Sequence, residues 1–173
     1  MADELKRALT TIVVICLFVA LGSRANSLGA HTPIPTTLQK EAGMMNHSSG
    51  TFEVKLTPHS DKAGDKTLGR ITIDKQWQGD LEGTSKGEML TAGTAVKDSA
   101  GYVAIETVTG TLKGRKGTFV LQHSGIMTRG QGQLTIIVVP DSGTDQLEGL
   151  TGKMTIKIEN GKHFYDFEYA LAH

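Results

Sequence analysis

Residues 101–127 read GYVAIETVTGTLKGRKGTFVLQHSGIM. Both halves of this stretch are rich in Val, Ile, Thr and aromatic residues, which suit a pleated and half-buried strand. The run Lys113-Gly114-Arg115-Lys116 separates them, and its glycine supplies the positive φ that a tight turn needs. The stretch therefore predicts two long antiparallel strands joined by a hairpin turn.

The turn also decides which residues of the two strands face each other. If Gly114 and Arg115 form a two-residue loop, Glu106 lies directly opposite His123. Because side chains alternate across a strand, both groups then share one face with apolar neighbours. These neighbours are Tyr102, Ala104, Val108, Leu112, Phe119, Leu121 and Met127. The register thus predicts an acid and an imidazole inside an apolar stripe.

Strand patterns recur along the chain from residue 50 onwards, with polar, glycine-bearing turns between them. We expect eight strands, at residues 50–57, 68–78, 81–94, 101–112, 117–128, 131–140, 146–159 and 162–171. Short links predict an up-and-down antiparallel sheet, and closure removes its exposed edges. The predicted fold class is therefore all-β, an eight-stranded antiparallel up-and-down β-barrel with room inside for side chains or one small ligand.

The first 27 residues have the composition of an export signal. Residues 1–7 carry charges, residues 8–21 are apolar, and Ala25-Asn26-Ser27 offers small residues to a signal peptidase. We expect a signal peptide at 1–27, a flexible segment at 28–47 and a single barrel domain at 48–173. Cleavage would give a periplasmic or secreted protein without a stable membrane span. The alternatives are a cytoplasmic protein and one anchored by an uncleaved apolar run.

The composition argues against several classes of partner. The formal charge is zero and the basic residues are spread singly except at the hairpin tip, so no nucleic-acid-binding face is predicted. The single cysteine, Cys16, lies in the leader, which excludes disulfides and thiolate sites from an exported chain. The spacing of the histidines predicts no metal site, and no glycine-rich loop precedes a predicted helix, so no cofactor is expected.

Glu106 and His123 are the candidate catalytic pair. A buried carboxylate beside an imidazole moves both pKa values towards neutrality, where proton transfer is most effective. A structural hydrogen-bonded pair is the alternative. We expect charged Glu106 to raise the pKa of His123 unless desolvation outweighs it, and small Ala104 and Gly125 to leave space for a ligand. The candidate ligand-binding residues are Tyr102, Trp77, Phe119, Leu121 and Met127, with a plug at a barrel end as the alternative role of Trp77.

Four runs resemble a known family: GRITIDK at 69–75, GDLEGTSKG at 79–87, GYVAIE at 101–106 followed by VTG at 108–110, and FVLQHSG at 119–125. Over residues 50–171 the chain is similar to the domain of unknown function 3224 family. The resemblance implies a fold like the allene oxide cyclase barrel, a small lipocalin-like barrel whose relatives include cyclases working in an apolar lumen. It implies no established activity, so cyclase chemistry is an analogy between folds.

Three functions follow from these observations. The favoured one is binding of a small, mostly apolar molecule in the barrel lumen. The first alternative is an isomerase or cyclase that uses Glu106 and His123. The second is a homo-oligomeric interaction module, because residues 131–139 have apolar side chains on both faces and one set must point outwards. The outward apolar residues would be Val103, Ile105, Ile126, Ile137 and Val139.

Overall fold

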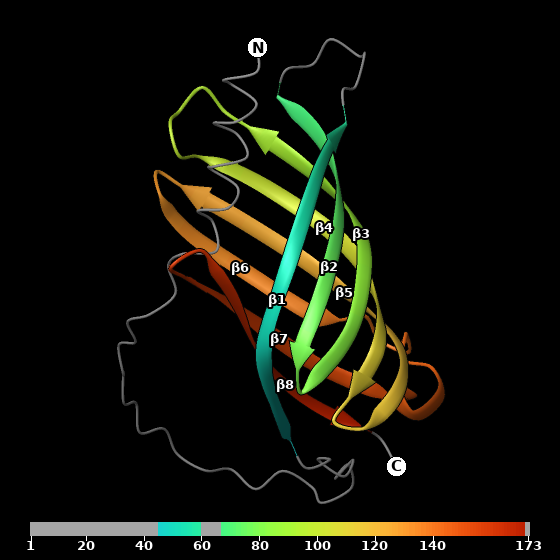
Figure 1. The fold of residues 1–173 in the computed structure, drawn as a ribbon. Coiled ribbons are helices and arrows are strands. Elements are labelled where there is room, and N and C mark those ends of the chain that lie inside the picture. Colours follow the sequence, from blue (N-terminus) through green and yellow to red (C-terminus); the bar gives the residue numbers. More distant parts are fainter. Residues whose placement is uncertain (1–44, 60–66, 172–173) are drawn as a thin grey trace, which may run out of the picture.

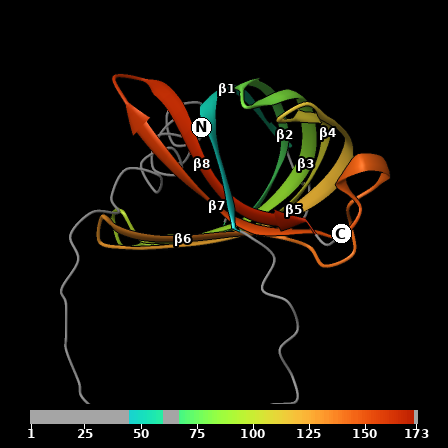
Figure 2. The same cartoon turned by 90° about the horizontal axis from the view of Figure 1, so that it is seen from below.

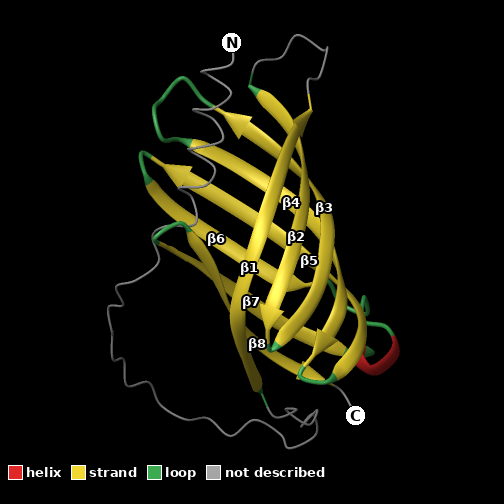
Figure 3. Cartoon of the chain, in the orientation of Figure 1, coloured by secondary structure: helices red, strands yellow, loops and turns green. Residues whose placement is uncertain are grey.

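The computed structural model describes residues 45–59 and 67–171. They form β1 (Asn46–His59), β2 (Leu68–Gly79), β3 (Leu81–Gly93), β4 (Ala100–Leu112), β5 (Arg115–Thr128), β6 (Gln131–Val138), the single-turn 3-10 helix η1 (Asp145–Leu147), β7 (Leu150–Glu159) and β8 (Lys162–Leu171) (Figure 1). Each strand pairs antiparallel with the next, and β8 pairs with β1 to close the barrel. The predicted fold class is confirmed, as the strand-dominated cartoon in Figure 3 shows.

The structure covers only part of the predicted N-terminal segments. The predicted signal peptide, 1–27, and most of the predicted flexible segment lie outside the described residues. The last two residues of that segment, Asn46 and His47, belong to β1, because they pair with Tyr169 and Glu168 of β8. The barrel therefore uses residues that the sequence pattern assigned to a flexible lead.

The strand predicted at 146–159 begins later than expected. Residues Asp145–Leu147 form η1, and the strand itself starts at Leu150. Gly149 has a φ of +74°, a left-handed conformation that interrupts an extended chain. The turn buries Leu147 completely in the core at this end of the barrel, which the alternation of a strand would not have achieved.

The central hairpin has a different register from the one predicted. Its turn residues are Lys113 and Gly114, with φ of +45° and +82°, so Leu112 lies opposite Arg115. Glycine occupies the second turn position, where a type I′ turn also needs positive φ. Glu106 therefore faces Leu121, and His123 faces Ala104. Because the shift is two residues, every side chain keeps its face, and Glu106 and His123 still point into the barrel together.

The wall is least continuous between β6 and β7. In the described part of the chain their ladder consists of two residue pairs, Ile136 with Met154 and Ile137 with Lys153. Beyond Val138 the connecting loop continues to pair with β5, since Val139 N–H donates to the Val120 carbonyl at 2.8 Å and Thr144 N–H to that of Thr118 at 2.9 Å. Figure 2 shows β7 and β8 diverging from β5 and β6 on one side of the barrel.

Buried side chains form two clusters along the barrel interior. One is rich in aromatic residues and includes Trp77, Phe119 and Phe167, with Phe119 and Phe167 stacked at 5.9 Å between ring centroids. The other consists of Ile71, Ile73, Met89, Tyr102, Ala104 and Met127. The shared inner face that the sequence predicted for the central hairpin is confirmed by the burial of its apolar residues, Tyr102, Ala104, Val108, Leu112, Phe119, Leu121 and Met127.

The backbones of β3 and β4 lie very close together at a pair of glycines. Gly83 lies opposite Gly110, and its φ is +149°. A Cβ atom on Gly83 would lie 2.2 Å from the Thr109 carbonyl oxygen and 2.6 Å from the Gly110 Cα. Both contacts are with backbone, which cannot rotate away. The glycine pair thus permits this close approach of the two backbones.

We predict that Gly83→Ala destabilises the protein by about 2 kcal/mol or more, because it combines overpacking with an unfavourable φ. The matched control is Gly93→Ala on the same strand, where the added Cβ would have its nearest contact at 4.0 Å. Its effect should stay within about 0.5 kcal/mol. Urea unfolding of the two variants measures the difference, and equal stabilities would contradict the close packing of the two backbones.

Candidate functional site

A layer of polar side chains separates the two apolar clusters. Four consecutive strands each contribute one inward-pointing residue: Lys75 from β2, Ser85 from β3, Glu106 from β4 and His123 from β5, and all four are buried. We call these four residues the polar layer. Their inward direction follows from the alternation of side chains along a strand. Lys75 continues the inner face of β2 after Ile71 and Ile73. Glu106 continues that of β4 after Tyr102 and Ala104.

Glu106 is the centre of this layer. The Lys75 ammonium nitrogen lies 2.7 Å from Glu106 Oε2, and the Ser85 hydroxyl donates to Oε1. His123 Nε2 lies 3.0 Å from the same Oε2 atom. This contact is close but poorly aligned with the ring N–H, so Nε2 is without a hydrogen-bond partner among the described residues. The carboxylate is thus held mainly by Lys75 and Ser85.

Aromatic rings hold the other partners in place. The Trp77 indole N–H donates to Ser85 Oγ at 2.9 Å, which directs the Ser85 hydroxyl proton towards Glu106. The Lys75 ammonium lies 4.8 Å from the ring centroid of Phe52 and 4.9 Å from that of Trp77. Such cation–π contacts stabilise a cation that has lost its water. Trp77 therefore supports both groups that bind the carboxylate.

The charges of the layer follow from these contacts. Burial acts to raise the pKa of Glu106, but Lys75, with His123, outweighs it and lowers that pKa to about 2. Burial lowers the pKa of His123, and Lys75 adds to the effect against the opposing influence of Glu106. The rise expected in the His123 pKa does not occur, because desolvation outweighs Glu106, which is the exception that the expectation allowed. Lys75 already neutralises the carboxylate, so a second buried cation is unfavourable and the imidazole is neutral.

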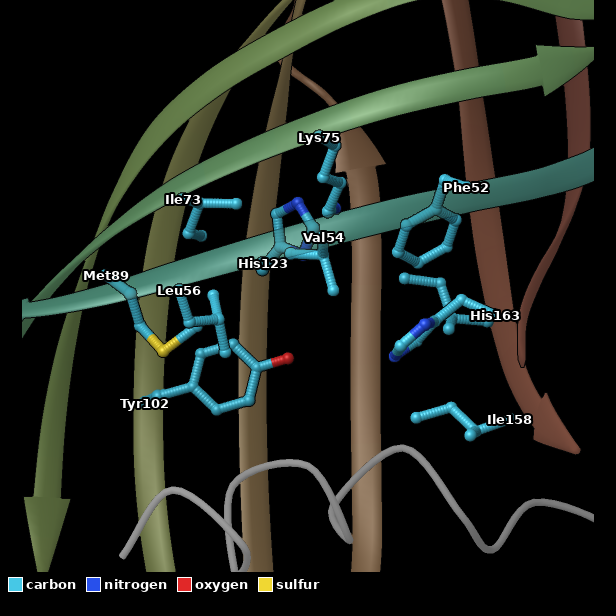
Figure 4. A pocket seen from close by; sticks show the side chains of 11 residues that line it. Phe52, Val54, Leu56, Ile73, Lys75, Met89, Tyr102, His123, Ile158 and His163 are labelled. Carbon is cyan, nitrogen blue, oxygen red and sulfur yellow. The ribbon is translucent and has the colours of Figure 1, made fainter. Parts of the chain in front are cut away.

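A cavity of about 70 Å³ lies beside the polar layer and is partly open to solvent (Figure 4). Its wall is mostly apolar, and Lys75, Tyr102, His123 and His163 are its polar members. The half-buried His163 packs against the Phe52 ring at 5.0 Å between centroids. Burial lowers the pKa of His163, with a further contribution from Lys75. The apolar lining consists of Phe52, Val54, Leu56, Ile73, Met89, Ile156 and Ile158.

The structure separates the residues expected to bind a ligand. Tyr102 lines the cavity, and its hydroxyl points towards the centre of the pocket in Figure 4. The other four, Trp77, Phe119, Leu121 and Met127, are packed in the clusters and do not line it. The space expected beside Gly125 is filled, because a Cβ there would lie 2.2 Å from the Tyr102 ring. The cavity lies instead on the side of β1 and β7.

Sequence reasoning missed Lys75 and Ser85. The signal for Lys75 was present, since the inward alternation of Ile71 and Ile73 continues to positions 75 and 77. A lysine at an inward position needs a buried anion, and Glu106 was already placed on an inner face. Ser85 had a weaker signal, because a small hydroxyl is equally common on an outer face.

Within 45–59 and 67–171, His, Cys, Asp and Glu side chains do not gather in groups of three or more that could hold a metal ion. The same residues include no helix with the length and apolar character needed to cross a membrane.

We predict that Lys75→Met destabilises the protein by about 3–5 kcal/mol, because it leaves the Glu106 carboxylate buried without a cation. Adding Glu106→Leu should recover much of this loss, since the pair is then replaced by apolar side chains. His123→Leu alone should cost less than Lys75→Met, because the imidazole carries no charge. Urea unfolding of Lys75→Met, of Glu106→Leu and of the double variant measures the coupling energy between the two residues.

The control is Lys153→Met, which breaks the exposed Lys153–Glu168 pair (2.8 Å). Solvent screens that pair, so its loss should be far smaller. Additive effects of Lys75→Met and Glu106→Leu would show that the two residues do not stabilise each other.

Comparison with known proteins identifies relatives of the whole barrel. Residues 48–169 match the family model described as protein of unknown function (DUF3224). The chain is also similar to a DUF3224 protein of unknown function from Shewanella oneidensis MR-1, whose crystal structure was determined at 1.84 Å resolution. The two sequences are 55% identical, and the two structures superpose with a TM-score of 0.71. The match covers 75% of this chain and 98% of that one. No curated protein matches. The chain therefore belongs to the DUF3224 family.

Proposed function

We propose that this protein binds a small, mostly apolar and uncharged molecule in the cavity beside the polar layer. The observation that carries the proposal is the cavity itself, in which an apolar lining converges with the imidazole of His123 and the phenol of Tyr102. Small-molecule sites typically combine an apolar wall with a few placed polar groups that fix orientation. The apolar body of the ligand would contact Val54, Ile73 and Ile156.

The charge of the polar layer favours an uncharged ligand. Lys75 and Glu106 neutralise each other at 2.7 Å, and His123 is neutral. An ionic ligand would lose its hydration without finding an unpaired opposite charge. A carbonyl or hydroxyl group can instead hydrogen-bond to an imidazole or a phenol. We therefore expect a ligand with an apolar body and one such group.

The size of the cavity limits the ligand further. A volume of about 70 Å³ compares with roughly 30 Å³ for a water molecule in the liquid and with roughly 150 Å³ for an apolar cavity that binds benzene. The enclosed space therefore suits a molecule of a few heavy atoms. A larger ligand would extend through the opening or displace a flexible side chain such as Met89, which lines the cavity.

We predict that short ketones bind in this cavity. Acetone, butanone and cyclopentanone would be titrated into the methyl-labelled full chain and followed by NMR. The methyl signals of Ile73 and Ile156 should shift and saturate, because both residues line the cavity. The signals of Val108 should not, since this residue is fully buried in the aromatic cluster.

Val54→Phe is the matched variant, because it adds a ring to the cavity wall and should abolish the saturable shifts. Ile137→Phe on the outer surface should leave them unchanged. Shifts that are absent from the unaltered protein, or that persist in Val54→Phe, would contradict binding at this place.

Catalysis is a second candidate, favoured by the contact between His123 and Glu106. A neutral imidazole beside a charged carboxylate is the form that can accept a proton, as in removal of a hydrogen next to a carbonyl group. The allene oxide cyclase-like fold that the family resemblance implies would support this candidate by analogy alone. Exchange of the ketone α-protons in D₂O distinguishes binding from catalysis. If the protein only binds the ketone, the exchange keeps the rate that it has in solvent alone. If the protein is a catalyst, the exchange is faster, and His123→Gln removes the acceleration.

A further inference from the structure

One side of the barrel wall has an outer surface of uncharged side chains. Among the described residues, the exposed outward-facing positions of 103–109 on β4, 122–128 on β5 and 131–137 on β6 are all Val, Ile, Thr, Ser or Gln. We call this surface the uncharged wall. The outer faces of β1, β3, β7 and β8 differ, since they carry exposed charges such as Lys55, Glu88, Lys157 and Glu168.

The apolar residues of the uncharged wall are neighbours in the sheet. Val103 lies directly opposite Leu90 of β3 and two residues from Ile105 on its own strand. Ile105 and Ile137 both face Gln122, from opposite sides. Their exposed fractions are 54% for Val103, 51% for Ile105, 56% for Ile126, 39% for Ile137 and 58% for Leu90. Leu90, Val103 and Ile105 are therefore an exposed apolar cluster, and Ile126 and Ile137 lie beside it among uncharged polar side chains.

The chemistry of the wall suits contact with itself. A two-fold interface places the same surface on both sides, so like charges near its axis would repel, and the uncharged wall on β4 to β6 has none. The exposed Glu82, Lys86 and Glu88 of β3 border this wall, and charges at the rim of an interface stay in contact with water. Its Thr, Ser and Gln side chains both donate and accept hydrogen bonds, so they can pair with their own copies. The chain also has a formal charge of zero, and two copies therefore do not repel at long range. A charged partner would bury its own charges against this wall without a counter-ion.

The uncharged wall, together with the outer face of β3 as its rim, is large enough for a reversible dimer. Four strands spaced about 4.8 Å apart and about 30 Å long present roughly 550 Å². Two copies would then cover roughly 1,100 Å², slightly above the ~1,000 Å² that specific interfaces need. This size is at the lower end of the range and indicates a dimer that dissociates on dilution rather than an obligate one.

From these observations we propose that two copies of this chain associate through the outer faces of β4 to β6, with Ile105, Ile126 and Ile137 at the centre of a two-fold interface and β3 at its rim. This surface is separate from the lumenal site, which lies inside the barrel. The interface would cover an apolar patch that otherwise remains in water.

Sedimentation velocity of the full chain over a concentration series tests this proposal. The unaltered protein should pass from monomer to dimer as its concentration rises from micromolar to millimolar. The double variant Ile105→Lys with Ile126→Lys should weaken the dimer about tenfold or more, because it places like charges across the axis. The double variant Ile105→Thr with Ile126→Thr keeps β-branched side chains, which suit a strand, and should also weaken the dimer. This variant replaces the lysine variant in the test if the lysine variant does not fold.

The matched control is Thr57→Lys with Thr155→Lys, which adds the same charge to the exposed outer faces of β1 and β7. This variant should dimerise like the unaltered protein. A strictly monomeric chain would overturn the proposal and leave the wall to another partner or to solvent. Association that survives the wall substitutions, or that the control variant weakens equally, would also overturn it.

Discussion

The barrel interior depends on the ion pair between Lys75 and Glu106. Two opposite charges that are almost fully buried are tolerated only when each is closely paired and hydrogen-bonded. Here the lysine lies 2.7 Å from the carboxylate and beside two aromatic rings, while Ser85 donates to the second carboxylate oxygen. This arrangement fixes how β2, β3 and β4 meet on the inside. It also leaves His123 beside an already neutralised carboxylate, and that determines the chemistry of the cavity.

The alternation of apolar side chains made the fold predictable. Patterns such as Ile71 and Ile73, or Met154 and Ile158, identify an inner face, and glycine-bearing turns separate the strands. The register of the central hairpin was harder to predict, because Lys113-Gly114 and Gly114-Arg115 both place a glycine in a two-residue turn. The structure uses the first. The error preserved the inner face, since a shift of two residues does not exchange the faces of a strand.

The candidate site was predictable in part. The proximity of Glu106 and His123 followed from their shared face. The lowered pKa of His123 depended first on its burial and then on Lys75, which comes from a strand distant in sequence. The sequence also suggested that Gly125 would leave a space, but the Tyr102 ring covers it. Which gaps remain open depends on side-chain packing across the whole barrel, and residues on β1 and β7 decide it here. Local patterns contain no information about such contacts.

The central claim is that Lys75, and not His123, carries the positive charge opposite Glu106. The most direct test is a pH titration of the imidazole ¹⁵N signals of His123 by NMR on the full chain. The account predicts a neutral ring at pH 7 that stays neutral below about pH 6.5, the ordinary pKa of histidine, because burial and Lys75 lower the pKa of His123. An imidazolium spectrum at pH 7 would contradict the account, since Glu106 would then be paired with two buried cations.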